Sequence, residues 1–182
     1  GSLMAASGNG FWDFSVKAFG TEGVAPALIA LQDRAGAHVN LMLFCCWAAG
    51  EGIAVDAGLL RQARASAGAW QIEIVEPLRA LRRKLKGGFG DFPADAVENL
   101  RKQINGLEIE GERIEQGRLA ALAAAKPRAT ADARLAVAGL ARYFAALGRR
   151  PDETDAGHLR TVITRLFPGS GLDGLNASDF AP

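Results

Sequence analysis

The stretch that decides the fold is residues 38–49, which read HVNLMLFCCWAA and are followed by Gly50. When this stretch is placed on a helix, apolar side chains point in nearly every direction. A helix that is apolar all round is buried inside a protein, because a surface helix keeps one polar face for water. We therefore expect residues 38–49 to form the central helix, with the rest of the chain packed around it.

The sequence on either side of this stretch is also helical in pattern. Apolar residues recur at intervals of three and four, Ala and Leu carry most of the hydrophobic mass, and β-branched residues are scattered. We predict an all-α fold of about eight helices, with a compact N-terminal half followed by a long antiparallel helix pair. The expected helices span residues 11–19, 23–34, 38–49, 56–64, 69–86, 93–126, 130–147 and 152–167. Gly68 is expected to separate the fourth and fifth helices, and Pro77 to kink or divide the fifth.

The longest expected helix, residues 93–126, should extend about 50 Å at 1.5 Å per residue. An a/d seam is predicted along it, formed by Val97, Leu100, Ile104, Leu107, Gly111 and Ile114. This seam needs a partner surface, either another helix of the chain or a second copy. Three glutamates (Glu108, Glu112 and Glu115) share another face, which we expect to be solvated.

The chain is expected to form one helical domain over residues 4–167, with an irregular Gly- and Ser-rich tail at 168–182. The Gly87–Gly90 run is the expected flexible break.

Charge and composition narrow the function classes. The 21 Lys and Arg residues nearly balance the 20 Asp and Glu residues, giving a net charge of +1. Binding to nucleic acid or to a membrane surface through bulk charge needs a clear basic excess, so we expect neither partner. No apolar run approaches the roughly 20 residues needed to cross a bilayer, and no signal peptide is visible. The one basic cluster, residues 79–86, lies at an expected helix C-terminus, where the macrodipole favours cations.

Neither the cysteines nor the histidines suggest a metal site. Cys45 and Cys46 are adjacent on the predicted central helix, where they should fill the core and stay reduced, as suits a cytoplasmic protein. The two histidines, His38 and His158, are far apart in the sequence. We therefore expect no metal and no cofactor. His38 could act as a general base, but the sequence shows neither an oriented partner nor a nucleophile for it.

The unusual polar residues are Gln32, Asp33 and Asn40, which lie next to the most apolar run in the chain. In one interpretation Asp33 and Asn40 cap backbone groups where two helices meet. In the other, these polar groups line a small-molecule pocket together with Trp12 and Trp47, and Trp70 is a further candidate. Caps are common, so the sequence favours the first interpretation.

Several blocks of the sequence resemble a known family. Residues 11–15 (FWDFS), 30–33 (ALQD) and 39–47 (VNLMLFCCW) are similar to those of a proteobacterial family of conserved hypothetical proteins, a domain of unknown function. Trp70 before residues 77–79 (PLR) and residues 107–113 (LEIEGER) resemble its later blocks. The resemblance spans Phe11 to Leu122. It implies a bacterial cytoplasmic protein, and no activity, substrate or catalytic residue.

From the residues alone, we favour a non-enzymatic helical protein that acts through protein–protein contact, including a homodimer along the long helix. The alternative is a small-molecule binding protein or an enzyme. Its polar pocket would lie near Trp12, Gln32, Asp33, Asn40 and Trp47. The sequence does not decide whether the protein is an enzyme.

Overall fold

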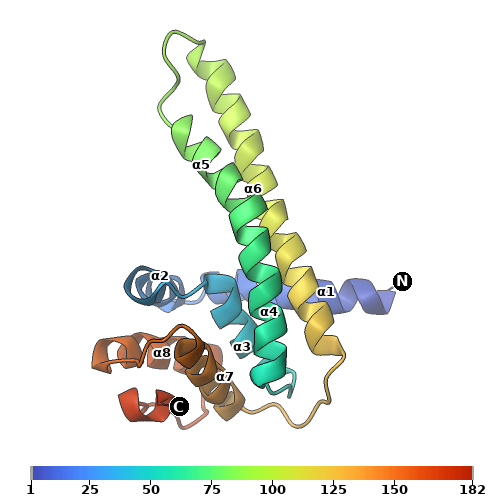
Figure 1. The fold of residues 1–182 in the computed structure, drawn as a ribbon, viewed down its shortest axis with the longest axis vertical. Helices are drawn as coiled ribbons and strands as arrows, with labels where there is room; N and C mark the ends of the chain where they lie inside the picture. The colour runs from blue at the N-terminus through green and yellow to red at the C-terminus, as the bar shows by residue number, and fades with distance from the viewer. Residues whose placement is uncertain (1, 182) are drawn as a thin grey trace.

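The structure is a computed structural model that describes the backbone of residues 2–181 and the side chains of residues 10–181. All the regular elements in this described part are helical, which confirms the all-α prediction (Figure 1). The elements are α1 (Ser2–Phe19), α2 (Val24–Ala35), α3 (Val39–Gly50), α4 (Ala57–Trp70), the π-helix η1 (Gln71–Val75), α5 (Glu76–Lys84), α6 (Ala94–Ala124), α7 (Ala133–Ala146), α8 (Glu153–Leu166) and the 3-10 helix η2 (Ala177–Phe180). A long hairpin of α4, η1, α5 and α6 projects from a body built by the other helices.

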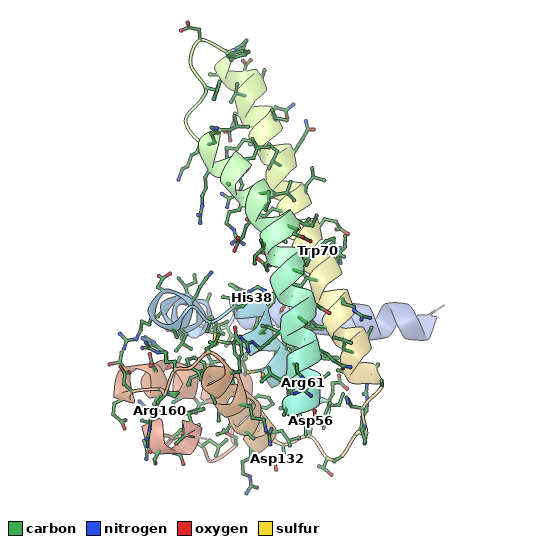
Figure 2. All side chains as sticks on the ribbon, viewed as in Figure 1. His38, Asp56, Arg61, Trp70, Asp132 and Arg160 are labelled. Atoms are coloured by element: carbon green, nitrogen blue, oxygen red, sulfur yellow. The ribbon has the colours of Figure 1, made fainter. Side chains whose placement is uncertain are left out.

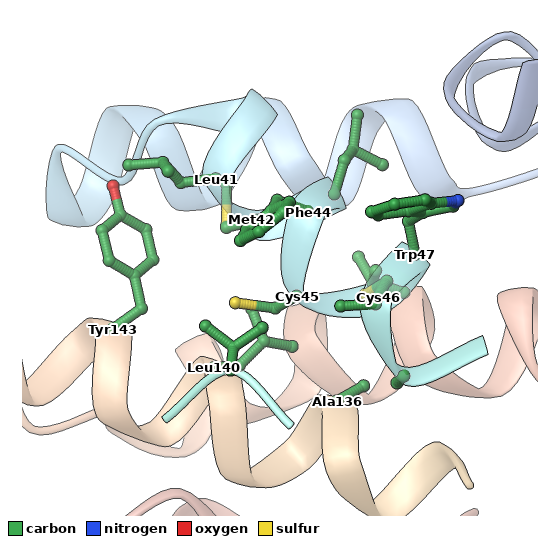
Figure 3. Close-up of a cluster of buried hydrophobic side chains, with 14 of the residues drawn as sticks. Leu41, Met42, Phe44, Cys45, Cys46, Trp47, Ala136, Leu140 and Tyr143 are labelled. Carbon is green, nitrogen blue, oxygen red and sulfur yellow. The ribbon is translucent and has the colours of Figure 1, made fainter. Parts of the chain in front are cut away.

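Helix α3 is the centre of the body, as its apolar sequence predicts. Residues 40–49 of α3 are all buried. Figure 3 shows Cys45 of α3 facing Leu140 of α7, with Ala136 further along the same helix. A Cβ added at Gly139 of α7 would lie 3.4 Å from Cys45 Sγ, so the glycine lets the two helices approach closely. Burial raises the pKa of the Cys45 thiol to about 12, which makes it a core side chain and not a nucleophile.

The first arm of the hairpin is one continuous rod and not the two helices expected. Gly68 lies inside α4 without ending it, and Pro77 lies in the first turn of α5. The π-helical turn η1 joins α4 to α5, and the N–H of Glu76 donates to the carbonyl oxygen of Gln71 five residues earlier. A proline clashes with the carbonyl four residues before it in an α-helix. For Pro77 that carbonyl belongs to Glu73, inside the π-turn, where the ordinary spacing is already relaxed.

Helix α6 buries a different stripe from the predicted seam. Leu100, Leu107 and Ile114 are about half exposed, so half of the seam faces solvent. The buried stripe runs through Ile104, Glu108, Gly111, Glu115 and Leu119. The expectation that the glutamate face is solvated is therefore wrong for Glu108 and Glu115, which are 6% and 3% exposed.

Both ends of the chain are more regular than the sequence suggests. Helix α1 begins at Ser2 instead of near residue 11. In the tail after residue 167, η2 is capped by Asn176, and Leu175 and Phe180 are buried against the body. Arg160 of α8 holds this tail by donating to the carbonyl oxygen of Leu175 at 2.8 Å. Part of the predicted irregular tail is thus a folded part of the core.

Helices α2 and α8 are joined through one buried carboxylate. Asp155 is 0% exposed and accepts hydrogen bonds from Arg34 of α2 and from Arg149 in the loop before α8. Its second role is local, because Asp152 and Asp155 form a reciprocal capping box at the start of α8.

Within the described residues, no single helix is both long enough and apolar enough to cross a membrane. The segments Gly10–Phe19 and Val24–Ala35 reach the required length and composition only when taken together, and they are bent by 95°.

Candidate functional site

A large cavity lies between the helical body and the first arm of the hairpin. Its volume is about 1130 Å³. Side chains from α1, α2, the α2–α3 junction, η1, α5 and α6 all contribute to its walls. Figure 2 shows His38 where the hairpin leaves the body. The polar residues of the wall include Ser15, His38, Asn40, Gln71, Glu112 and Gln116.

Behind this wall lies a buried carboxylate with three donors. Glu115 Oε1 lies 2.6 Å from His38 Nε2 and accepts from Asn40 Nδ2 at 3.3 Å. Glu115 Oε2 accepts from Gln71 Nε2 at 2.6 Å. The side chain of Glu115 is 1% exposed and has no arginine or lysine partner. Its hydrogen bonds therefore come from His38 and two neutral amides.

The carboxylate fixes the direction of every amide in this network. Because Glu115 can only accept, Asn40 must turn its Nδ2 toward it and present Oδ1 on the other side. Asn40 Oδ1 accepts from Gln116 Nε2 at 2.9 Å, and the same nitrogen donates to Ser15 Oγ at 2.7 Å. The remaining atom of that amide, Gln116 Oε1, is buried and has no hydrogen-bond partner among the described residues. An unsatisfied buried acceptor costs about 1–3 kcal/mol.

His38 has the oriented partner that sequence reasoning did not find. Glu115 lies 77 positions away in the chain, and its Oε1 is hydrogen-bonded to His38 Nε2. When Nε2 donates to a carboxylate, a neutral imidazole carries its lone pair on Nδ1. Nδ1 has no partner among the described residues, and the His38 side chain is 23% exposed. The backbone N–H of His38 donates to the buried hydroxyl of Tyr143 at 2.7 Å, which holds the start of α3 in place.

The π-turn and one glycine bring Gln71 to Glu115. A Cβ added at Gly111 of α6 would lie 3.4 Å from Val75 Cγ2, so glycine allows η1 to pack closely on α6. Trp70 Nε1 donates to the carbonyl oxygen of Gly111 at 2.7 Å, directly before the π-turn. These contacts place Gln71, the first residue of η1, against Glu115. Glu115 lies one helical turn after Gly111 on α6.

Two arginines of α5 cover the other glutamates of α6. Arg79 donates to Glu108 at 2.9 Å and to Glu112 at 3.0 Å, and Arg82 also binds Glu108. Burial would raise the pKa of Glu108, but the hydrogen bonds from Arg82 and Arg79 outweigh it and lower that pKa. Burial raises the pKa of Glu112, because its share of Arg79 does not offset desolvation and the nearby Glu108 and Glu115. The macrodipole explanation of this basic cluster is therefore incomplete, since Arg79 and Arg82 have specific partners.

Four of the five residues proposed for the pocket line this cavity, namely Trp12, Gln32, Asp33 and Asn40. Trp47 does not, because it is two turns further along α3 and stacks on Phe11 in the core at 5.2 Å between ring centroids. Arg113 lies 5.2 Å from the ring centroid of Trp12.

The capping interpretation is wrong for Asn40, whose partners are Glu115 and Gln116. Gln32 and Asp33 are exposed and lie at the outer part of the cavity wall, so they do not share a network with Asn40.

Four residues of the network are not predicted from the sequence, namely Ser15, Gln71, Glu115 and Gln116. One signal was available: Glu115 and Gln116 follow Ile104 and Gly111 on a helix whose next turns are apolar. A carboxylate and an amide at such positions need partners inside the fold.

Two other features of the structure do not form a site. Among the described residues, no group of three or more His, Cys, Asp and Glu side chains is placed to hold a metal ion. A second hollow of about 850 Å³ lies between α4, α7 and the tail, and Arg61, Arg64, Arg134 and Arg142 line it. No buried unpartnered polar atom of the described residues lies there. Surface arginines without such an atom do not define a site.

Residues 10–119 match DUF2390, described as a protein of unknown function. The chain belongs to this family. All the residues of the Glu115 network lie inside the DUF2390 match, whereas α7, α8 and η2 lie outside it. The source organism and the sequence blocks suggested by the resemblance stay predictions. No curated protein matches the chain, and no solved structure does.

Proposed function

We propose that this protein binds a small molecule in the cavity between the helical body and the hairpin. One observation carries the proposal: Gln116 lines the cavity, and its Oε1 is a buried acceptor without a partner among the described residues. Buried polar atoms in folded proteins are nearly always paired, so an orphan beside a cavity of this size is best explained by a donor supplied from a ligand. The DUF2390 match contains every residue of the network, which supports a site belonging to the family's own domain.

The proposal is tested by native mass spectrometry of the full chain purified under non-denaturing conditions, before and after denaturation. A retained molecule at one copy per chain, lost in Gln116→Met, is the expected result. The matched control is Gln103→Met, which changes an exposed glutamine of the same helix and should keep the ligand. A ligand retained equally by both variants would place binding elsewhere. The proposal would be refuted if no molecule is retained and a high-resolution structure shows an ordered water that donates to Gln116 Oε1.

A second candidate function is self-association through α6, the form of protein–protein contact that the sequence favours. Leu100, Leu107 and Ile114 recur every seven residues, and each is about half exposed. A heptad spacing of this kind matches a second copy of the same helix, because a row repeating every seven residues stays on one face of a helix pair.

Sedimentation velocity of Leu107→Glu tests this second candidate. If α6 pairs with a second copy, the variant is monomeric where the parent is dimeric. Its thermal stability stays close to that of the parent monomer, because Leu107 is 58% exposed. The matched variant Ile104→Glu, at a position 5% exposed, should instead cost several kcal/mol by burying an unpaired charge. An unchanged sedimentation coefficient for Leu107→Glu would rule out this surface.

A further inference from the structure

The chemistry of the ligand follows from the hydrogen-bond directions around Glu115, and this inference rests on the proposed function. A carboxylate accepts and does not donate, so His38 and Gln71 each donate an N–H to Glu115. Gln116 Nε2 donates its two N–H groups to Ser15 Oγ and Asn40 Oδ1. When the imidazole of His38 is neutral, each of the three side chains has an acceptor left over.

Three acceptors thus belong to residues that line one cavity. They are His38 Nδ1, Gln71 Oε1 and Gln116 Oε1, and none has a partner among the described residues. Gln116 Oε1 is buried, whereas the other two atoms retain some exposure. A wall of this kind rejects a carboxylate or phosphate, because an anion offers the same acceptors and no donors.

The charges near this wall favour a positive ligand. Glu108, Glu112 and Glu115 share one face of α6, and the two arginines that bind this face contact only Glu108 and Glu112. Glu115 has only His38 and the two amides. The raised pKa of Glu112 agrees with a carboxylate that lacks full compensation.

The outer lining of the cavity has no such excess. The lining includes the acidic Asp33, Glu76 and Glu112 and the basic Arg64, Arg79 and Arg83, so its carboxylates and arginines are equal in number. Of the three glutamates on the α6 face, the one that no arginine of the described residues binds is Glu115, which lies behind the wall.

The cavity wall also carries exposed apolar side chains. Large hydrophobic side chains with exposed fractions between 46% and 66% line it, namely Val16, Phe19, Ile29, Ile72 and Ile109. Solvated apolar side chains gathered around one hollow are stabilised when a hydrocarbon group displaces the water.

We infer that the ligand is an organic primary amine, whose ammonium group donates to His38 Nδ1, Gln71 Oε1 and Gln116 Oε1 and whose hydrocarbon body contacts the apolar wall. An ammonium carries three donors and no acceptor, which matches the three free acceptors in number and kind. Its positive charge complements Glu115 behind the wall.

Isothermal titration of the full chain with three probes of similar size tests the inference. The probes are phenethylamine, 2-phenylethanol and 3-phenylpropionate, which differ mainly in the head group. Phenethylamine should bind at least tenfold more tightly than either of the others. Gln116→Met should weaken phenethylamine binding at least tenfold, and Gln103→Met should leave it unchanged.

The remaining outcomes separate this inference from the proposed function. Tighter binding of the alcohol or the carboxylate, lost in Gln116→Met, would overturn the amine and leave the cavity as a ligand site. Binding of phenethylamine that is equal in both methionine variants would overturn the inference, because the acceptor wall would not be used. If none of the three probes binds, the amine inference is overturned too. The native mass spectrometry experiment then tests the proposed function by itself.

Discussion

Two buried carboxylates, Asp155 and Glu115, have different kinds of hydrogen-bond partners. Asp155 accepts from Arg34 and Arg149 and from the backbone N–H of Asp152, so both of its oxygens are paired and its charge is matched. Glu115 has two neutral amides and one histidine, and its network ends at Gln116 Oε1, which has no partner in the described part of the chain. Both carboxylates are almost fully buried. Burial alone therefore does not distinguish the two carboxylates, whereas the completeness of the surrounding hydrogen bonds does.

The two networks should also differ in how much they contribute to the stability of the free protein. A complete network contributes its full stability to the free protein. An incomplete one contributes less, because an unpaired buried acceptor lowers the stability of the free protein, and under the proposed function a ligand supplies the missing donor.

The largest expected effect is that of Asp155→Asn. This change removes the charge that both arginines share and weakens the capping box. It should lower the free energy of unfolding by about 3 kcal/mol, the low end for a broken buried pair, since Arg34 and Arg149 can turn to water. Urea denaturation measures it. Asp152→Asn is the control, because asparagine caps a helix as well and the lost ion pair is exposed. Equal losses in the two variants would contradict a special role for Asp155.

The next effect is a pH dependence that belongs to Asp155. Burial raises its pKa, but the hydrogen bonds from Arg149 and Arg34 outweigh burial and hold the pKa at about 2, below the ordinary 3.8. A lowered folded-state pKa gives stability that is present above the unfolded value and is lost as pH falls through the folded value. The contribution is roughly 2 kcal/mol. The stability difference between parent and Asp155→Asn should thus be largest near pH 6 and shrink toward pH 2. A difference that stays constant over that range would show that Asp155 does not titrate as described.

Asn40→Leu should have an effect of roughly 1–3 kcal/mol. The change removes one of the three donors to Glu115 and the acceptor for Gln116 in the same step. Asn105→Leu, at an exposed position of α6, is the control and should change stability by less than about 0.5 kcal/mol. Thermal melting of both variants gives the result. An unchanged melting temperature in Asn40→Leu would mean that the network contributes nothing to the free protein.

The smallest effect should be that of Gln116→Met in the absence of ligand. This change removes two hydrogen bonds and leaves Asn40 Oδ1 without its donor, but the unpartnered Gln116 Oε1 disappears at the same time, so the net loss should be smaller than that of Asn40→Leu. The informative quantity is the ratio of this loss to that of Asn40→Leu, measured under the same conditions. Equal losses would show that Oε1 is already satisfied in the free protein, which would remove the contrast between Glu115 and Asp155.

The helical class and the central helix could be predicted from the sequence because both depend on local pattern. The run from Leu41 to Ala49 is apolar on every side, and only a buried helix accommodates it. The Glu115 network could not be predicted in this way, because its hydrogen bonds join residues 44 to 101 positions apart. Nothing in the sequence around His38 or Asn40 indicates which distant helix supplies the carboxylate.

The error on α6 has a similar origin. Two stripes of residues satisfy heptad spacing on this helix, and the more apolar one includes Leu100 and Leu107. The fold buries the other stripe, because Arg79 and Arg82 of α5 neutralise Glu108. Which stripe is covered is decided by the partner helix, and the local sequence of α6 does not contain that information.

The π-turn at Gln71–Val75 can be expressed as an insertion of a single residue in an otherwise α-helical rod. Deleting one residue there would restore regular α-helix and rotate everything after it by about 100° relative to α4. Arg79 and Arg82 would then leave Glu108, while the packing of α4 on the body would be untouched. One three-nucleotide insertion is therefore enough to turn a plain helical hairpin into one whose two arms carry matched charges and whose joint presents Gln71 to a cavity.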